Sequence, residues 1–229
     1  MSTVTTIQIT CPACNTEQDY TMRGSVNGAE RPDLKEELLA GRLNVTTCPT
    51  CKRNIQVAHP IFYSDPSHKY WIWLLPAPEE ADPEELEEIE EVLEDEVPAD
   101  FICRTVREMN EFLEKIRVLE DGLDDRVMEI LKMFIMFNTH PEVRKDPESL
   151  VYYNRMVHDT EGDEYIQFMA VGRYETTTLN LKIDAYTYMQ MDFKPFLITE
   201  ESVRGEWLEV DQLYARSALE GLFMRMGRA

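Results

Sequence analysis

The chain has 229 residues, 43% of them hydrophobic, and a formal net charge of −21. This length and composition suffice for one large or two ordinary globular domains without help from disulfides. The negative charge repels the phosphates of nucleic acids, so unspecific nucleic-acid binding is disfavoured. The N-terminal residues lack the basic flank and apolar run of a secretion signal, and no stretch approaches the ~18 apolar residues of a membrane span, which predicts a cytoplasmic protein without a membrane partner.

The charge is unevenly distributed along the chain. Residues 1–76 carry seven bases and seven acids, residues 77–100 carry thirteen acids and no base, and residues 101–229 carry sixteen bases against twenty-four acids. We therefore expect an N-terminal module over residues 1–76, an acidic linker or helix over residues 77–100, and an α+β C-terminal domain over residues 101–229.

Four of the five cysteines form two Cys-Pro-x-Cys motifs, CPAC and CPTC, separated by 33 residues. The residues on either side of each motif alternate in polarity and are rich in β-branched types, so each motif is predicted to lie between two strands. Two hairpins result. The motif cysteines are Cys11 and Cys14, then Cys48 and Cys51.

The residues between and after the motifs predict a helix and a further strand. Leu34, Leu38 and Leu39 recur on one helical face, and Gly41 is a stop signal. Residues 69–76 are aromatic and apolar and end in proline, which is typical of a buried strand.

Two closely spaced thiolate pairs are the ligand arrangement of a zinc ribbon. Zinc prefers four tetrahedral ligands, and a two-residue gap lets consecutive thiolates bind one ion from a tight turn. We therefore predict one structural Zn²⁺, with iron as an alternative metal, because a four-thiolate site accepts both. A disulfide-exchange function is disfavoured, since such a motif opens a helix, whereas residues 15–22 continue as a strand. The predicted ligands are Cys11, Cys14, Cys48 and Cys51.

The remaining cysteine and the histidines form no set with ligand spacing. Cys103 is predicted to be a small packed residue. His59 and His68 flank the second motif closely enough to be considered as a surface pair, while His140 and His158 stand apart. No histidine shows the neighbours of a recognisable catalytic triad, so no catalytic residue is predicted.

Residues 76–100 form a low-complexity segment, whose most acidic part is residues 79–96. Leu86, Ile89 and Leu93 recur at helical spacing between flanking prolines, which predicts an acidic amphipathic helix between two turns. A solvated structural helix, a tether and a partner-binding surface all fit this composition.

Residues 104–137 have a strong helical period that predicts a helical hairpin or a kinked pair. Gly122 can end the first helix, and the aspartates after it favour the start of the second. Residues 132–137 are apolar nearly all round, which indicates a helix buried on several sides. The two apolar stripes are Val106, Met109, Leu113 and Ile116, and then Val127, Ile130, Leu131 and Phe134.

In the C-terminal part, apolar residues recur at every second position, which is the period of a β-strand. This pattern predicts a three-stranded antiparallel meander with one solvent-exposed face. The predicted strands are residues 149–157, 164–171 and 177–183. A helix over residues 184–193, a strand over 205–212 and a closing helix over 214–226 are expected after it. The predicted fold class is therefore α+β: zinc-ribbon-like β hairpins with an inserted helix, a helical hairpin, and an antiparallel meander with helices.

The sequence resembles the bacterial CpXC proteins over about residues 7–135. The resemblance rests on CPAC and CPTC, on LKEELLAGRLNVTTCP before the second motif, on HPIFYSDP after it, and on NEFLEKIRVLEDGLDDRVMEILK. It implies that the four motif cysteines are metal ligands, and it supplies no activity to transfer. It also raises the alternative that the ribbon and the helical hairpin form one domain.

Three functions are compatible with these features. The favoured hypothesis is a zinc-binding, non-enzymatic adaptor or protein-interaction module with an unidentified protein partner. The alternative is a nucleic-acid-binding ribbon, and the third is an enzyme with a site in the C-terminal part. The alternative would use Arg42, Lys52, Arg53 and Lys69 with Tyr63, Tyr70 and Trp71, and the third would use His158, Asp159, Glu161 and Asp163.

Overall fold

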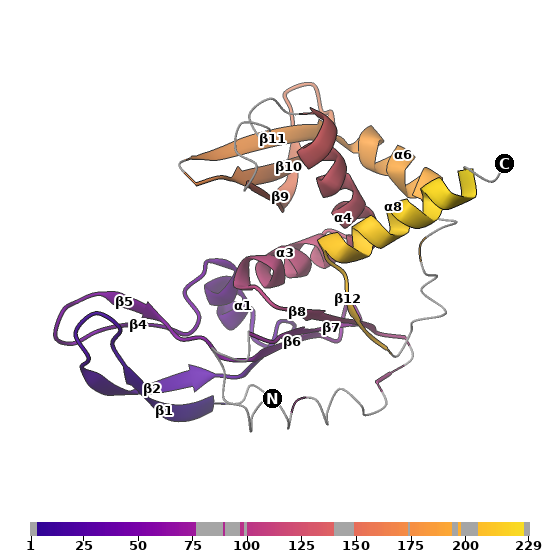
Figure 1. Ribbon diagram of the computed structural model, residues 1–229. Helices are drawn as coiled ribbons and strands as arrows, with labels where there is room; N and C mark the ends of the chain where they lie inside the picture. The colour runs from indigo at the N-terminus through magenta and orange to yellow at the C-terminus, as the bar shows by residue number, and fades with distance from the viewer. Residues whose placement is uncertain are drawn as a thin grey trace. The chain divides into compact units, whose positions relative to one another are not determined.

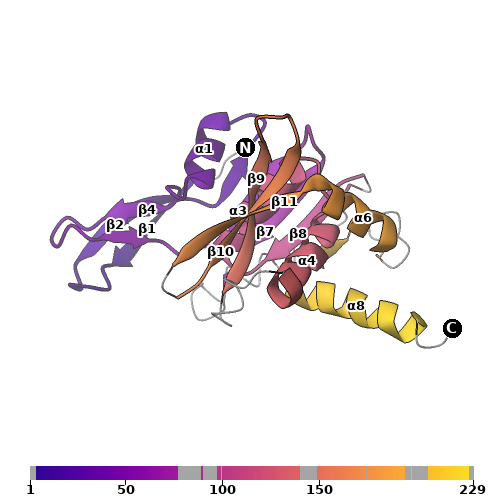
Figure 2. The same ribbon diagram turned by 90° about the horizontal axis from the view of Figure 1, so that it is seen from above.

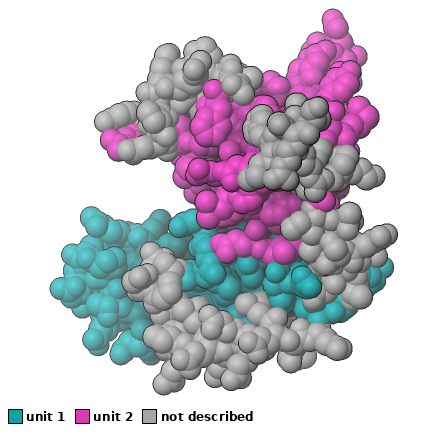
Figure 3. All heavy atoms as spheres, turned by 45° about the vertical axis from the view of Figure 1, so that its right-hand side comes forward, with its two compact units in different colours: residues 1–109, 204–207 teal, residues 110–203, 208–229 magenta. Residues whose placement is uncertain are grey.

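The computed structural model describes residues 4–76, 89, 97–98, 100–139, 149–173, 175–193, 197 and 206–226. Helices and several β-sheets are mixed along the chain, which confirms the predicted α+β class. The chain divides into two compact units, residues 1–109 with 204–207 and residues 110–203 with 208–229 (Figure 3). Compactness does not show that a unit folds alone, so the domain boundaries expected at residues 76 and 100 stay a prediction.

The predicted acidic helix over residues 79–96 lies outside the described residues, except for Ile89. That residue is helical and 7% exposed. His140 also lies outside the described residues. No helix in the described part of the chain has the length and hydrophobicity that a membrane span needs.

In the first unit, each Cys-Pro-x-Cys motif joins two antiparallel strands, as predicted. Strand β1 (Val4–Thr10) pairs with β2 (Glu17–Arg23), and β4 (Val45–Thr47) pairs with β5 (Asn54–Gln56) (Figure 1). Each hairpin is a separate two-stranded sheet. The strands of the first hairpin have seven residues each and alternate in polarity, which explains their pairing. The strands of the second hairpin have three residues each.

The helix between the two hairpins is also confirmed. Helix α1 (Pro32–Leu39) begins with proline, whose fixed φ suits the first turn, and buries Leu34 and Leu38. Gly41 follows with φ +66°, a left-handed conformation that glycine adopts at little cost and that ends the helix.

A five-stranded sheet forms the centre of the first unit. Its order is β12-β8-β7-β6-β3, with β3 parallel to β6, β6 antiparallel to β7, and β7 parallel to β8. Trp207, the first residue of β12, belongs to this unit. The bounds are β3 (Ser25–Asn27), β6 (Ile61–Asp65), β7 (Tyr70–Leu74), β8 (Ile102–Val106) and β12 (Trp207–Glu209).

Strand β8 corrects one expectation. The helical stripe predicted to include Val106 is wrong at its start, because residues 102–106 pair with β7 and the helix begins only at Met109. The pairing partner is distant in sequence, so the local period could not reveal it.

The second unit contains the two predicted helices, α3 (Met109–Glu120) and α4 (Asp125–Phe134). Gly122 between them has φ +69°, and the Asp124 carboxylate accepts a hydrogen bond from the backbone N–H of Arg126 at 3.0 Å. The glycine ends one helix and the aspartate caps the next, as the sequence predicts.

The end of the second helix differs from expectation. After Phe134 the chain continues as a π-helix, η1 (Ile135–Thr139), and the side chain of Phe137 is 64% exposed. A π-turn rotates the following side chains out of the 3.6-residue register, so the expectation of a helix buried on several sides is wrong at residue 137.

The predicted meander is present, with strand order β11-β10-β9 and antiparallel pairing throughout (Figure 2). Helix α6 contacts β10 and β11, while α4 contacts β9, α6 and α8. One face of the meander therefore lies in the apolar core of this unit. The bounds are β9 (Leu150–His158), β10 (Glu164–Val171), β11 (Thr176–Lys182), α6 (Ile183–Phe193) and α8 (Gln212–Met226).

A buried ion network joins α3 to α4. Lys132 Nζ lies 2.7 Å from Glu114 Oε2 and 2.8 Å from Glu129 Oε1. Lys115 Nζ lies 3.1 Å from Asp125 Oδ2 and donates to the carbonyl oxygen of residue 210 at 2.7 Å. All five side chains are buried, so each charge depends on its partners rather than on water.

Candidate metal centre

The two cysteine motifs adopt the same backbone turn. In the first, the N–H of Cys11 donates to the carbonyl of Thr16, and the N–H of Asn15 donates to the carbonyl of Cys11, both at 2.9 Å. The same two hydrogen bonds recur in the second motif, with Cys48, Lys52 and Arg53 in the places of Cys11, Asn15 and Thr16. The two knuckles are thus repeats of one structure.

The residue after the second cysteine of each motif has a left-handed backbone. The φ angle is 56° at Asn15 and 61° at Lys52. This conformation reverses the chain directly after the motif, so the second strand of each hairpin can return along the first. Asparagine tolerates it well, whereas lysine adopts it at an energetic cost.

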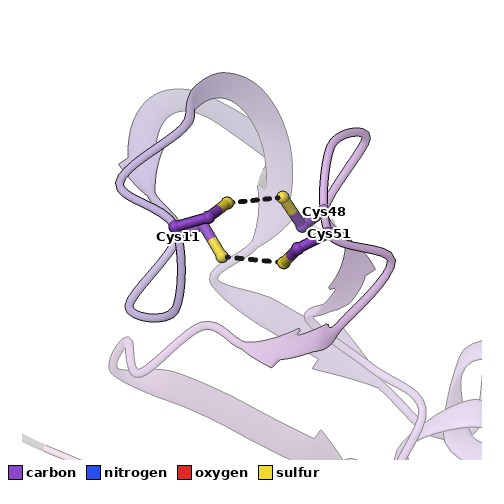
Figure 4. Close-up of side chains that lie close together, drawn as sticks. Cys11, Cys48 and Cys51 are labelled. Carbon is purple, nitrogen blue, oxygen red and sulfur yellow. Dashed lines mark hydrogen bonds between the residues drawn. The ribbon is translucent and has the colours of Figure 1, made fainter.

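The four motif sulfurs form one cluster. All four Sγ atoms lie within 4.8 Å of one another, and the distances from Cys11 to Cys51 and from Cys14 to Cys48 are 3.6 Å (Figure 4). Zinc–sulfur bonds of about 2.3 Å imply tetrahedron edges of about 3.8 Å. The cluster therefore has the size of a four-thiolate metal site, and all of these cysteines are free thiols.

The cluster has an inner and an outer side. Cys11 and Cys48 are 0% exposed, whereas Cys14 and Cys51 are exposed. Among the residues that the structure describes, Ile55 and the half-buried Ile9 pack with the inner pair. Such a core is too small to hold two hairpins together by burial alone, so the sulfur cluster needs another source of stability.

Local hydrogen bonds polarise the thiols. The Thr16 hydroxyl, 3.2 Å from Cys14 Sγ, and the Thr16 backbone N–H lower the pKa of Cys14 to about 6. The backbone N–H of Cys51 lowers the pKa of Cys48. Thr16 was not predicted to belong to the site. Its position two residues after a motif cysteine is the sequence feature that points to this contact.

Cys51 shows the opposite effect. The backbone N–H of Arg53 acts to lower its pKa, but desolvation and the neighbouring thiols outweigh this and raise the pKa to about 11. Adjacent thiolates repel one another, so four of them ionise together only when a cation neutralises their charge. The donor set thus has the chemistry of a site for a soft divalent metal.

Cys103 is a packed residue, as predicted. It lies on β8, is 1% exposed, and burial raises the pKa of its thiol to about 11. It does not belong to the sulfur cluster.

The histidines near the second motif do not form the surface pair considered from the sequence. His59 is buried, and burial lowers its pKa. The exposed His68 instead contacts Asp65, with 2.9 Å between Nδ1 and Oδ2 in the β6–β7 turn.

The polar residues considered as an enzyme site form a turn of the meander. The Asp159 carboxylate accepts hydrogen bonds from the backbone N–H groups of Glu161 and Asp163, at 2.9 and 3.0 Å. His158 contacts Glu164 of the paired strand at 3.0 Å. These exposed contacts are the ordinary local bonds of an aspartate in a turn.

The groups considered for nucleic-acid binding are only partly accessible. Tyr63 and Tyr70 are 0% and 1% exposed, so they offer no face to a base. Lys69 pairs with Asp100 at 2.7 Å, and Lys52 Nζ donates to the carbonyl of Pro49 at 2.8 Å.

The comparisons with known proteins identify one family. A family model described as CpXC protein matches residues 9–132, more than half of the chain. The match begins before the first knuckle and ends within α4, close to the range expected from the sequence. Neither the curated proteins nor the solved structures that were compared gave a match.

Proposed function

The chain belongs to the CpXC family, and we propose that it is a zinc-stabilised adaptor that binds a protein partner and catalyses no reaction. One observation carries this proposal: four thiols from two knuckles with the same backbone turn meet within 4.8 Å in a part of the fold whose described residues form almost no apolar core. The metal would be the main contact between the two hairpins.

Zinc is the metal that this donor set favours for a structural purpose. Four cysteines complete a tetrahedral shell, so no position remains for the water that a catalytic zinc activates. Zinc binding to such sites contributes on the order of 10 kcal/mol to folding in zinc-finger peptides. That free energy would replace the missing core of the hairpins.

The surface of the ribbon supports an interaction function. Most side chains of β1 are exposed, and β1 pairs with β2 alone in its sheet. Within the described residues, the backbone of β1 therefore keeps one edge for pairing with another strand. Extended segments of partner proteins bind such edges by adding a strand.

The two other candidate functions have less support. For nucleic-acid binding, two of the three proposed stacking groups are buried. For catalysis, the polar cluster around Asp159 is explained by turn formation.

The test is affinity capture of the tagged full-length chain from its native cells, quantified by mass spectrometry. Three baits are compared: the wild-type chain, the Cys14→Ser/Cys48→Ser double variant, and Cys103→Ser as a matched cysteine control. A partner that is retained by wild type and by Cys103→Ser but lost from the double variant is the expected result. Capture of the same proteins by all three baits, or co-purification of nucleic acid in place of a protein, would contradict the proposal.

A further inference from the structure

Asn44 is a buried polar residue outside the sulfur cluster, and turn formation does not explain its contacts. It directly precedes β4 and has a φ angle of 55°, a left-handed conformation that asparagine tolerates well. Asn15 has nearly the same φ, 56°, but is exposed, as is usual for an asparagine in a turn. Asn44 is 3% exposed. Burial of an amide is unfavourable unless its donor and acceptor both find partners, so those partners indicate what the residue does.

The side chain of Asn44 bonds to the first hairpin. Its Oδ1 accepts a hydrogen bond from the backbone N–H of Arg23, and its Nδ2 donates to the carbonyl oxygen of Arg23, both at 2.9 Å. Arg23 is the last residue of β2 and lies 21 positions earlier in the chain. The amide thus gives Arg23 the same donor and acceptor that a residue of a paired strand would give it.

The backbone of Asn44 bonds to the second hairpin. Its carbonyl oxygen accepts a hydrogen bond at 2.9 Å from the N–H of Val57, which directly follows β5. Gln56 Nε2, in β5, donates to the carbonyl oxygen of Leu43 at 3.2 Å. Asn44 therefore lies at the base of the second hairpin, and this one residue joins the end of β2 to the outer ends of β4 and β5.

The two hairpins thus meet at both ends. At their tips, the two shortest sulfur–sulfur contacts, Cys11–Cys51 and Cys14–Cys48, each join one knuckle to the other. At their bases, the amide of Asn44 makes the connection. A metal binds more tightly to ligands that are already close together, because less conformational entropy is lost on binding. Contacts at the bases can therefore raise the metal affinity of thiols at the tips.

We propose that Asn44 is a positioning residue of the metal site, which aligns the two knuckles so that their four thiols meet before a metal binds. This inference rests on the proposed structural zinc and adds that the metal closes a site whose halves are already aligned. The competing explanation is the pairing of β3 with β6, which also brings the bases together, since the N–H of Phe62 donates to the carbonyl oxygen of Gly24 at 2.9 Å. That bond lies outside the hairpins, whereas Asn44 bonds directly to both.

The Asn44→Gly variant tests the proposal, because glycine adopts the left-handed backbone without strain and lacks the amide. Asn15→Gly is the matched control: it is the same substitution at the same backbone conformation, at an exposed position of the first knuckle. In competition with a zinc chelator, Asn44→Gly should bind zinc about tenfold more weakly than wild type, since the backbone groups of Arg23 lose their partners. Asn15→Gly should bind zinc at least as tightly as wild type.

The thiols of the metal-free chain report their alignment independently of metal binding. The chain is equilibrated with oxidised and reduced glutathione, and mass spectrometry gives the ratio of disulfides between the knuckles to disulfides within one knuckle. Wild type and Asn15→Gly should form mainly the Cys11–Cys51 and Cys14–Cys48 pairs. In Asn44→Gly, disulfides within each Cys-Pro-x-Cys motif should replace them.

Two further variants separate alignment from general stability. Leu34→Val weakens the packing of α1 in the same unit and leaves the contacts of Asn44 in place, so its disulfide ratio should equal that of wild type. Asn44→Asp can accept from the N–H of Arg23 but cannot donate to its carbonyl, so both of its readouts should lie between wild type and Asn44→Gly. The aspartate variant decides the question if the glycine variant does not fold.

Equal zinc affinity and equal disulfide ratios in wild type and Asn44→Gly would overturn the proposal and would assign the alignment to the pairing of β3 with β6. A shifted disulfide ratio in Asn15→Gly or Leu34→Val would overturn it as well. A wild-type chain that binds no zinc would instead contradict the proposed function, and the disulfide ratio would still test the role of Asn44.

Discussion

At the scale of single residues, the left-handed backbone at Lys52 separates the two otherwise equivalent knuckles. Asn15 occupies the same place in the first motif with a similar φ, 56° against 61°. A lysine in this conformation costs about 1–2 kcal/mol relative to glycine, because its Cβ approaches a backbone carbonyl. The second knuckle is thus the more strained of the two.

We therefore expect Lys52→Gly to stabilise the metal-bound ribbon by about 1 kcal/mol relative to Lys52→Ala. Both variants lose the bond from Lys52 Nζ to Pro49, so their comparison isolates the backbone conformation. The measurement is the chelator concentration that removes half of the metal from each. A glycine variant that releases metal as readily as the alanine variant would contradict the assigned strain.

Cys103→Ser should leave the metal content of the chain unchanged, because four other thiols form the cluster. In the wild-type chain, Cys103 should also react slowly with iodoacetamide near neutral pH. It is buried, and its pKa of about 11 leaves almost no thiolate. Metal analysis and mass spectrometry of the alkylated peptides check both points; a lost metal equivalent in the serine variant would mean that the ligands are wrongly assigned.

At the scale of helices and strands, local patterns predicted what local forces determine. The strands at the knuckles, α1, the meander, α6 and α8 all follow from alternation, helical period and stop signals in the sequence. The strand at residues 102–106 was missed because its stability comes from pairing with β7, which lies about thirty residues earlier.

The ion network of α3 and α4 was also missed, for a different physical reason. Lys115, Glu129 and Lys132 lie between the apolar stripes, where charged residues are normally solvated. The sequence of one helix does not show which charged side chains of another helix will contact it. The packing of α3 against α4 in the structure shows that opposite charges of the two helices neutralise one another away from water.

Lys132→Met should destabilise the second unit by about 3–5 kcal/mol, because it leaves Glu114 buried without its cation and leaves Glu129 with Lys115 Nζ at the longer distance of 3.8 Å. Urea unfolding followed by hydrogen exchange of the meander measures the change. Arg216→Met is the control: its pair with Glu220 is exposed, and such pairs contribute less than about 1 kcal/mol. Equal losses in the two variants would mean that the buried network contributes no more than a surface pair.

The pH dependence of Lys132→Met follows from Glu114. Burial raises the pKa of this carboxyl above its ordinary value of 4.5, and loss of the Lys132 charge, which lowers that pKa, raises it further. Between the ordinary pKa of 4.5 and the raised pKa of the folded state, the folded state binds more protons than the unfolded state. The free energy of unfolding therefore falls as the pH rises through this window. Lowering the pH from about 7 to about 5 should return part of the stability lost in the variant. A variant that loses further stability on this acidification would contradict the assigned role of Glu114.

At the scale of the whole molecule, metal removal should affect the parts of the chain unequally. The knuckle hairpins have a core of a few side chains, whereas the meander has a large apolar core of its own. Chelation should therefore raise hydrogen exchange in β1, β2, β4 and β5 while β9, β10 and β11 stay protected. Uniform exchange along the chain would mean that the metal holds more than the ribbon, and unchanged exchange in the hairpins would mean that they fold without it.

The measurement that tests the account most directly is the metal content of the full-length chain, purified without chelators and analysed by native mass spectrometry with elemental analysis. The geometry of the sulfur cluster predicts one zinc per chain, retained in Cys103→Ser and lost from the Cys14→Ser/Cys48→Ser double variant. A wild-type chain that carries no tightly bound metal, or a double variant that keeps its zinc, would contradict the assignment of these four cysteines as the ligands of a structural metal.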